Sequence, residues 1–207
     1  VGAVLAVVQT DVKRMLAYSS VAHTGFLLTG VLGVQSATDL ADGQVTSLQA
    51  VLFYLTTYGF AMIGAFAVVT LVRDAGGEAT HFSRWAGIGR RSPLVAGLFA
   101  FFLLSMAGIP LTAGFVGKWA VFTVALSAGA WPVVIAAVLS SIVAVFFYVR
   151  VIVLMFFVDG DGELASVTRP SVLTSGTIGV GVVATLLLGV VPGPVLTLAA
   201  HAGQFIR

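Results

Sequence analysis

A lysine inside an apolar run is the residue of this sequence best suited to move a proton. Lys118 lies in GIPLTAGFVGKWAVF, residues 108–122, and no other long apolar segment contains a lysine. A charged lysine at the centre of a bilayer costs at least about 2.5–3.5 kcal/mol. Burial therefore favours exchange between the charged and the neutral amine. The alternative is that the side chain extends to an interface. We predict that Lys118 relays protons.

The helix that carries Lys118 is predicted to be broken just before it. Pro110 removes a backbone donor and clashes with the preceding turn, while Gly108 and Gly114 loosen the same stretch. Because unpaired backbone groups are costly in hydrocarbon, such a break is tolerated only where it is buried in protein or faces water. Transporters build ion sites at discontinuous helices of this kind. The pattern predicts a hydrated site beside a titratable amine.

His23 is the second candidate for a proton relay. It lies in the apolar segment 15–34, on a helical face that it shares with Ser19, Ser20 and Thr24. Imidazole titrates near neutral pH and can pass a proton in either direction. The alternative is a histidine whose ring nitrogens are satisfied by a neighbouring helix, and the sequence leaves both interpretations open.

Four further residues are candidates for supporting this polar path. Tyr54 and Tyr58 belong to a polar stripe in segment 48–72, for which hydrogen bonds between packed helices are the favoured explanation. Arg150 lies eight residues before the end of segment 131–158, so its charged group can reach an interface. Lys13 follows the first apolar residues and is favoured as a marker of topology.

The apolar segments predict an all-α bundle of membrane-spanning helices that positions these residues. A span needs about 20 apolar residues. The run at 93–126 exceeds one straight span, which agrees with the predicted break. Residues 1–8 are expected to end a helix of a longer protein, and 192–207 to form a C-terminal tail. The connection 73–92 is expected to include a short interfacial helix. The five predicted spans are 15–34, 48–72, 93–126, 131–158 and 172–191.

Composition supports a membrane location and excludes several chemistries. Of 207 residues, 59% are hydrophobic and 9% are charged, whereas a soluble domain has about 25% charged residues. The absence of cysteine excludes disulfides and iron–sulfur ligation by this sequence. It contains no nucleotide-binding loop, no HExxH and no paired intramembrane carboxylates, so we predict neither a cofactor nor a metal on this chain. No basic surface with interleaved aromatic residues indicates nucleic acid.

Basic residues predict the orientation of the chain. They gather in alternate loops, whereas loop 35–47 contains Asp39 and Asp42, and 127–132 has no charge. The positive-inside rule places the basic loops in the cytoplasm. The C-terminal tail, with Arg207, is then on the outer side, periplasmic in a bacterial plasma membrane. The basic loop residues are Lys13, Arg14, Arg73, Arg84, Arg90, Arg91 and Arg169.

Three segments, in this order, resemble the antiporter-like subunits of respiratory complex I, the proton-translocating NADH-quinone oxidoreductase. They are QTDVKRMLAYSSVAHTGFLL (9–28), VLFYLTTYGFAMIGAFAVV (51–69) and LLSMAGIPLTAGFVGKWAVF (103–122). The resemblance covers essentially the whole chain from Gln9. The second segment, 51–69, narrows the resemblance to one particular kind of subunit within this family.

This resemblance implies an inverted-repeat fold in which the chain supplies the end of the family's ninth helix and its tenth to fourteenth helices. Lys118 is then the lysine of the broken twelfth helix, in a chain of protonatable residues that couples quinone reduction to proton translocation. The resemblance places NADH, FMN, iron–sulfur clusters and quinone on other subunits. It implies as partners the other membrane-arm subunits, including neighbouring antiporter-like subunits, and the lipid bilayer. The family's remaining glutamate and lysines lie upstream.

Other functions are compatible with the same motifs. A subunit of a multi-subunit sodium/proton antiporter shares them but has no redox partner, and its transport depends on sodium. A structural scaffold of the membrane arm predicts that substitution of Lys118 leaves pumping intact. The membrane arm of a hydrogenase is a third alternative.

Overall fold

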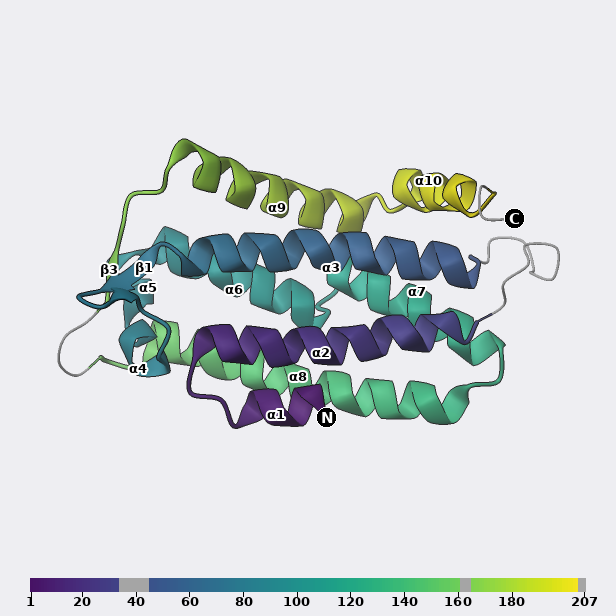
Figure 1. Cartoon of the computed structure of the whole chain (residues 1–207), viewed down its shortest axis with the longest axis horizontal. Coiled ribbons are helices and arrows are strands. Elements are labelled where there is room, and N and C mark those ends of the chain that lie inside the picture. Colours follow the sequence, from purple (N-terminus) through teal and green to yellow (C-terminus); the bar gives the residue numbers. More distant parts are fainter. Residues whose placement is uncertain (34–44, 161–164, 205–207) are drawn as a thin grey trace.

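The computed structural model describes residues 1–33, 45–160 and 165–204, which form a bundle of helices along one long axis (Figure 1). The helices are α1 (Gly2–Val7), α2 (Val12–Val31), α3 (Ser47–Val69), α4 (Phe82–Trp85), α5 (Ile88–Arg91), α6 (Pro93–Ala107), α7 (Ala113–Ser127), α8 (Trp131–Phe157), α9 (Val172–Val190) and α10 (Gly193–Gln204).

Three of the described helices, α3, α8 and α9, are long and apolar enough to cross a membrane. Helix α2 has the length but is less apolar, because it begins with Lys13 and Arg14. The predicted span 93–126 is divided into α6 and α7, each of 15 residues. Each half is about 22 Å long, short of the roughly 30 Å of hydrocarbon. The division into five spans stays a prediction.

The helices begin where capping residues satisfy free backbone amides. Asp11 accepts a hydrogen bond from the amide of Arg14 at 2.9 Å and caps α2. Thr46 and Gln49 form a capping box at the start of α3, and Ser171 caps α9. Such caps are worth about 1 kcal/mol each. They fix the ends of the bundle and so the depth of each side chain along it.

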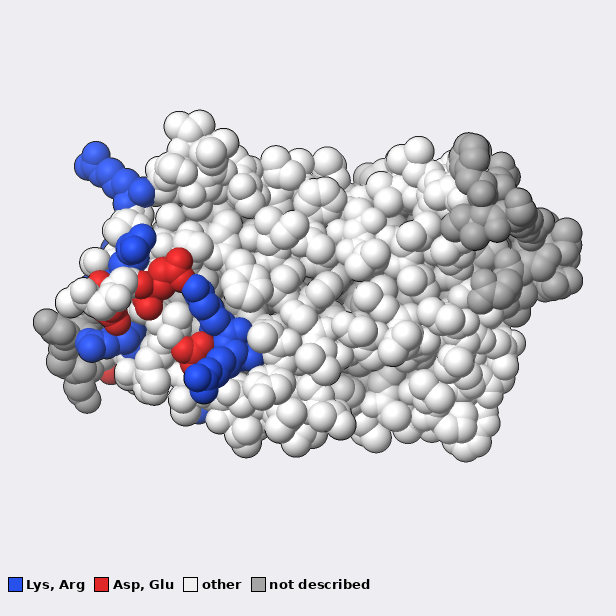
Figure 2. Space-filling view, in the orientation of Figure 1, with Lys and Arg blue, Asp and Glu red and all other residues white. Residues whose placement is uncertain are grey.

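On the face that Figure 2 shows, the charged side chains of the described residues lie at one end of the bundle. A three-stranded antiparallel sheet, in the order β2-β1-β3, ties together the connections at this end. Helices α4 and α5 meet α6 at 119° and lie across the same end. The basic loops within the described residues therefore share one side, as predicted. The strands, which were not predicted, are β1 (Val72–Asp74), β2 (Gly77–Glu78) and β3 (Ser166–Val167).

The predicted loop 35–47, with Asp39 and Asp42, lies mostly outside the described residues, and so does Arg207.

The outer faces of α8 and α9 carry exposed large apolar side chains such as Leu139, Ile142 and Leu187. Faces of this kind suit lipid rather than water. The main core lies between α2, α3, α6 and α8, around the fully buried Phe99, Phe102 and Leu103.

Candidate proton-transfer site

The break between α6 and α7 lies near the middle of the long axis (Figure 1). Helix α6 ends at Ala107, and Gly108 adopts the left-handed conformation, with φ of 91°, that turns the chain out of the helix. Pro110 lies in the link, and Gly114 lies in the first turn of α7. The three predicted break residues thus bracket the interruption. The break leaves backbone groups at two helix ends without partners inside their own helix.

Lys118 is bonded to one of those ends. Its Nζ donates to the carbonyl oxygen of Ala107 at 2.8 Å and to Oγ of Ser141 on α8 at 2.8 Å. The Ala107 carbonyl belongs to the last turn of α6, where the helix dipole is negative, so it stabilises a cation. Only 6% of Lys118 is exposed. The lysine therefore does not extend to an interface, and no carboxylate among the described residues forms an ion pair with it.

A groove of about 280 Å³ borders Lys118 on one side. Its polar lining comes from Lys118 and Ser141, and its apolar lining includes Phe115, Trp119 and Phe122. A space of this size has room for several water molecules, and the amine and hydroxyl supply hydrogen-bond partners for them. Hydration of the break stays a prediction.

His23 lies at the centre of a second polar cluster. The hydroxyl of Tyr54 lies 2.7 Å from its Nδ1, and the hydroxyl of Tyr148 lies 3.2 Å from its Nε2. Tyr148 is also hydrogen-bonded to Ser19. The ring of Tyr58 stacks on the imidazole, with centroids 4.2 Å apart. Neighbouring helices therefore satisfy both ring nitrogens, as the structural interpretation of His23 predicts.

The same contacts form a continuous row of hydrogen bonds from Tyr54 through His23 and Tyr148 to Ser19. A neutral imidazole has one donor and one acceptor nitrogen. If Tyr54 donates to Nδ1, then Nε2–H donates to Tyr148, and Tyr148 donates to Ser19. If a proton is delivered to Tyr54, shifting each proton one step along these hydrogen bonds releases a proton from Ser19 without any large movement of side chains.

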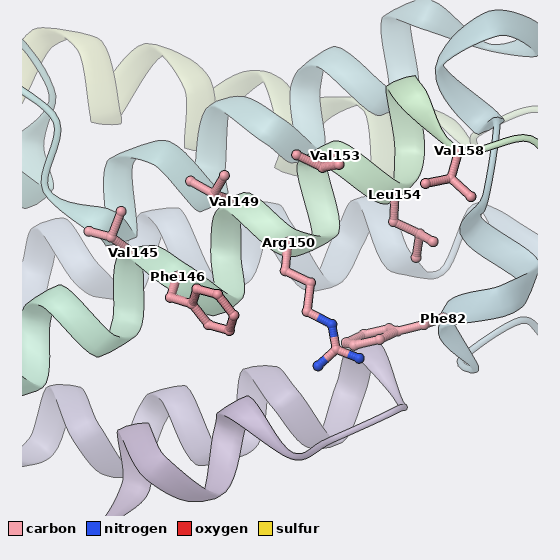
Figure 3. A pocket seen from close by; sticks show the side chains of 8 residues that line it. All are labelled: Phe82, Val145, Phe146, Val149, Arg150, Val153, Leu154 and Val158. Carbon is pink, nitrogen blue, oxygen red and sulfur yellow. The ribbon is translucent and has the colours of Figure 1, made fainter.

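Lys13 and Arg150 lie apart from both clusters. Lys13 pairs with Glu78 at the charged end, ten residues and about 15 Å along α2 from His23. The Arg150 guanidinium donates to the Val7 carbonyl at 2.9 Å and stands over the ring of Phe82 (Figure 3). An apolar groove of about 580 Å³ runs beside it. Neither residue contacts Lys118 or His23 in the described structure.

Replacing Arg150 with alanine is expected to lower the stability of the bundle by about 1–2 kcal/mol. The change removes a cation from the C-terminal end of α1, worth about 0.3–1 kcal/mol, and a cation–π contact, worth about 0.5–1 kcal/mol. The melting temperature of the detergent-solubilised protein measures this. Arg90→Ala, which breaks an exposed ion pair with Asp159, is the matched control. An unchanged melting temperature in Arg150→Ala would contradict the prediction.

Sequence reasoning did not single out Tyr148 and Ser141 for the site. They lie seven residues apart on α8, and a spacing of seven places two side chains on one face of a helix. That periodicity is the signal that could have identified them. Among the described residues no three histidine, aspartate or glutamate side chains are grouped so as to hold a metal ion.

A helical bundle with a broken helix and a buried lysine at the break defines an antiporter-like membrane subunit, and the comparisons agree. The chain belongs to the family described as "NADH:quinone oxidoreductase/Mrp antiporter, TM", whose model matches residues 1–144. It is similar to NADH-quinone oxidoreductase subunit N of Nocardioides sp. (strain ATCC BAA-499 / JS614), with 83% identity over 211 residues. That alignment covers 100% of this chain and 40% of the relative. Subunit N is also the kind of subunit that segment 51–69 indicates, so the resemblance is confirmed.

Two solved structures are similar to the chain. A chain of "Respiratory complex I from Thermus thermophilus with bound Aureothin" has a TM-score of 0.74 and 31% identity, covering 95% of this chain and 42% of that chain. A chain of "Structure of Mrp complex from Dietzia sp. DQ12-45-1b" has a TM-score of 0.79 and 22% identity, covering 98% and 44%, and shows the fold alone. The present chain spans about two fifths of the length of the curated relatives it matches.

Proposed function

We propose that the chain is part of a membrane-arm subunit of an NADH-quinone oxidoreductase, and that it moves protons through Lys118. The observation that carries the proposal is a buried amine at the broken helix, bonded to the Ala107 carbonyl and to Ser141. The name of the Nocardioides relative reported above supports the assignment to this enzyme. The redox groups then belong to other subunits, and the neighbouring membrane-arm subunits are partners.

The surroundings of Lys118 balance its two protonation states. Burial favours the neutral amine, whereas the Ala107 carbonyl and the Ser141 hydroxyl favour the charged one. A unit charge that moves to about 4 Å changes the interaction energy by up to roughly 4 kcal/mol at an effective dielectric constant of about 20. This corresponds to a change of about three orders of magnitude in proton affinity. A charge that moves to this distance is therefore sufficient to load or unload Lys118.

The hydrogen-bonded cluster around His23 provides the next part of the proton route in this proposal. It contains hydroxyl and imidazole groups on three helices, which is the composition of a proton relay. By the positive-inside rule the charged end of the bundle faces the cytoplasm. The C-terminus then lies on the periplasmic side of a bacterial plasma membrane.

Sodium transport is the main alternative, because the fold is shared with a chain of an Mrp complex. Both oxygens that Nζ of Lys118 contacts accept hydrogen bonds from the amine, so they are not free to coordinate a sodium ion. Inverted membrane vesicles that contain the full subunit test the choice. We expect NADH to acidify the lumen equally with and without sodium. Acidification that requires sodium would contradict proton transport.

Replacing Tyr148 with phenylalanine is expected to reduce the rate of NADH-driven acidification without abolishing assembly. The change removes the hydroxyl that joins His23 to Ser19 and leaves both without this partner, at a cost of about 1–3 kcal/mol. The initial rate of acidification per assembled complex is the measurement. Tyr18→Phe, whose hydroxyl takes part in none of these contacts, is the control. Equal rates in the two variants would remove Tyr148 from the route.

A further inference from the structure

Phe26 lies between the two polar clusters of the site. It is one helical turn from His23 on α2, and the centroids of the two rings are 5.4 Å apart in an edge-to-face arrangement. On its other side, Nζ of Lys118 stands over the ring, 5.2 Å from its centroid. Phe26 is 2% exposed. A fully buried apolar ring therefore touches both groups that are proposed to hold a proton.

The N–H groups of Lys118 point at partners other than His23. An ammonium group has three donors. Two are used by Ala107 and Ser141, and the remaining side of the amine faces the Phe26 ring, an attraction worth about 0.5–2 kcal/mol. No hydrogen bond joins Lys118 to His23 among the described residues. A proton passes between them only if the ring moves and water takes its place.

We propose that Phe26 is a gate that separates Lys118 from the His23 cluster and so determines on which side the lysine exchanges its proton. With the ring in its present position, Lys118 exchanges with the groove of about 280 Å³ that it lines. With the ring displaced, a water bridge connects the lysine to His23. The inference rests on the proposed function, and it adds that transport is directional because these two connections alternate.

The surroundings of the ring allow this displacement. Phe26 packs edge-to-face against Phe122 of α7, with centroids 5.8 Å apart. Phe122 itself lines the groove beside Lys118. Movement of Phe122 into the groove therefore makes room for Phe26 to rotate without unfolding either helix. A purely apolar cavity stays dry, but the space that Phe26 leaves is bordered by an amine and an imidazole, so water can occupy it.

The test is the passive proton conductance of proteoliposomes that contain the complete complex, without NADH, under an imposed potassium diffusion potential. Phe26→Ala is expected to raise this conductance several-fold and to lower the proton gradient reached with NADH at a given rate of NADH oxidation. The double variant Phe26→Ala/Lys118→Ala is expected to have the conductance of the parent, because the leak passes through the lysine. Phe99→Ala, which removes an equally buried ring elsewhere in the core, is expected to leave the conductance unchanged.

Parent-level conductance in Phe26→Ala would overturn the gate, and so would a leak that persists in the double variant. If Phe26→Ala does not assemble, Phe26→Val is judged by the same two criteria. The single variant Lys118→Ala keeps the two proposals apart. Lost NADH-driven pumping in Lys118→Ala without a leak in Phe26→Ala refutes the gate alone, whereas normal pumping in Lys118→Ala refutes the proposed function.

Discussion

Gly114→Ala is expected to abolish assembly of the subunit, although it adds a single methyl group. A Cβ at this position would overlap the carbonyl oxygen of Ser105 and lie 2.8 Å from its carbonyl carbon. Both are backbone atoms of the last turn of α6, so no change of side-chain rotamer relieves the overlap. Helix α7 would have to move away from α6 and lose its packing contact with that helix. We expect a loss of more than about 4 kcal/mol, which is exceptional for one substitution.

The amount of assembled complex on a native gel measures this effect. Gly25→Ala is the matched control, because a Cβ at Gly25 would meet no atom within 4 Å. Gly25 lies inside α2, where alanine is favoured over glycine by about 1 kcal/mol. The control is therefore expected to assemble like the parent. Normal assembly of Gly114→Ala would contradict the close contact of α6 and α7 on which the whole site depends.

Lys118→Ala is expected to assemble and to lose NADH-driven proton translocation, with slower NADH oxidation. The change leaves the Ala107 carbonyl without this donor, at a cost of about 1–3 kcal/mol. It also removes a charge whose burial costs at least about 2.5–3.5 kcal/mol. Because these terms oppose one another, the bundle is expected to persist. The measurement is lumen acidification in inverted vesicles together with the rate of NADH oxidation.

Two further variants show whether pumping requires an exchangeable proton on residue 118 or only a side chain of similar volume. Lys118→Arg keeps a cation but cannot release its proton at working pH, so we expect no translocation from it. Leu187→Ala changes a side chain on the outer face of α9, which is 58% exposed and does not line the groove beside Lys118, and is expected to pump normally. Normal pumping in Lys118→Ala would favour the structural scaffold, in which the lysine only packs.

Local sequence was sufficient to predict the break and the lysine beside it. Gly108 and Pro110 act on the backbone of their own residues, and a lysine in an apolar run is visible without knowledge of its neighbours. The partners of Lys118 were not predictable in this way. Ala107 is a backbone acceptor eleven residues away, and Ser141 comes from α8. The identity of these partners depends on how the helices pack.

The small sheet at the charged end was also not predictable from local sequence. Strands β1 and β3 have three and two residues and lie more than ninety residues apart in the sequence. Such short strands leave no alternation of apolar and polar residues for sequence analysis to detect. Lys13 was a candidate for supporting the polar path, although it was favoured as a marker of topology. Its ion pair with Glu78 of β2 depends on the fold of the connection, which holds it at the end of the bundle.

The most direct measurement restores the amine of Lys118 chemically. The sequence contains no cysteine, so Lys118→Cys places the chain's single thiol at the site, beside the groove that Lys118 lines. Reaction with 2-bromoethylamine then forms a lysine analogue, and iodoacetamide forms a neutral adduct, with mass spectrometry confirming each. We predict that NADH-driven acidification returns after aminoethylation and does not return with the neutral adduct or in Lys118→Ala treated identically. Equal acidification by the two adducts, or none from a fully aminoethylated protein, would contradict a proton carried by this amine.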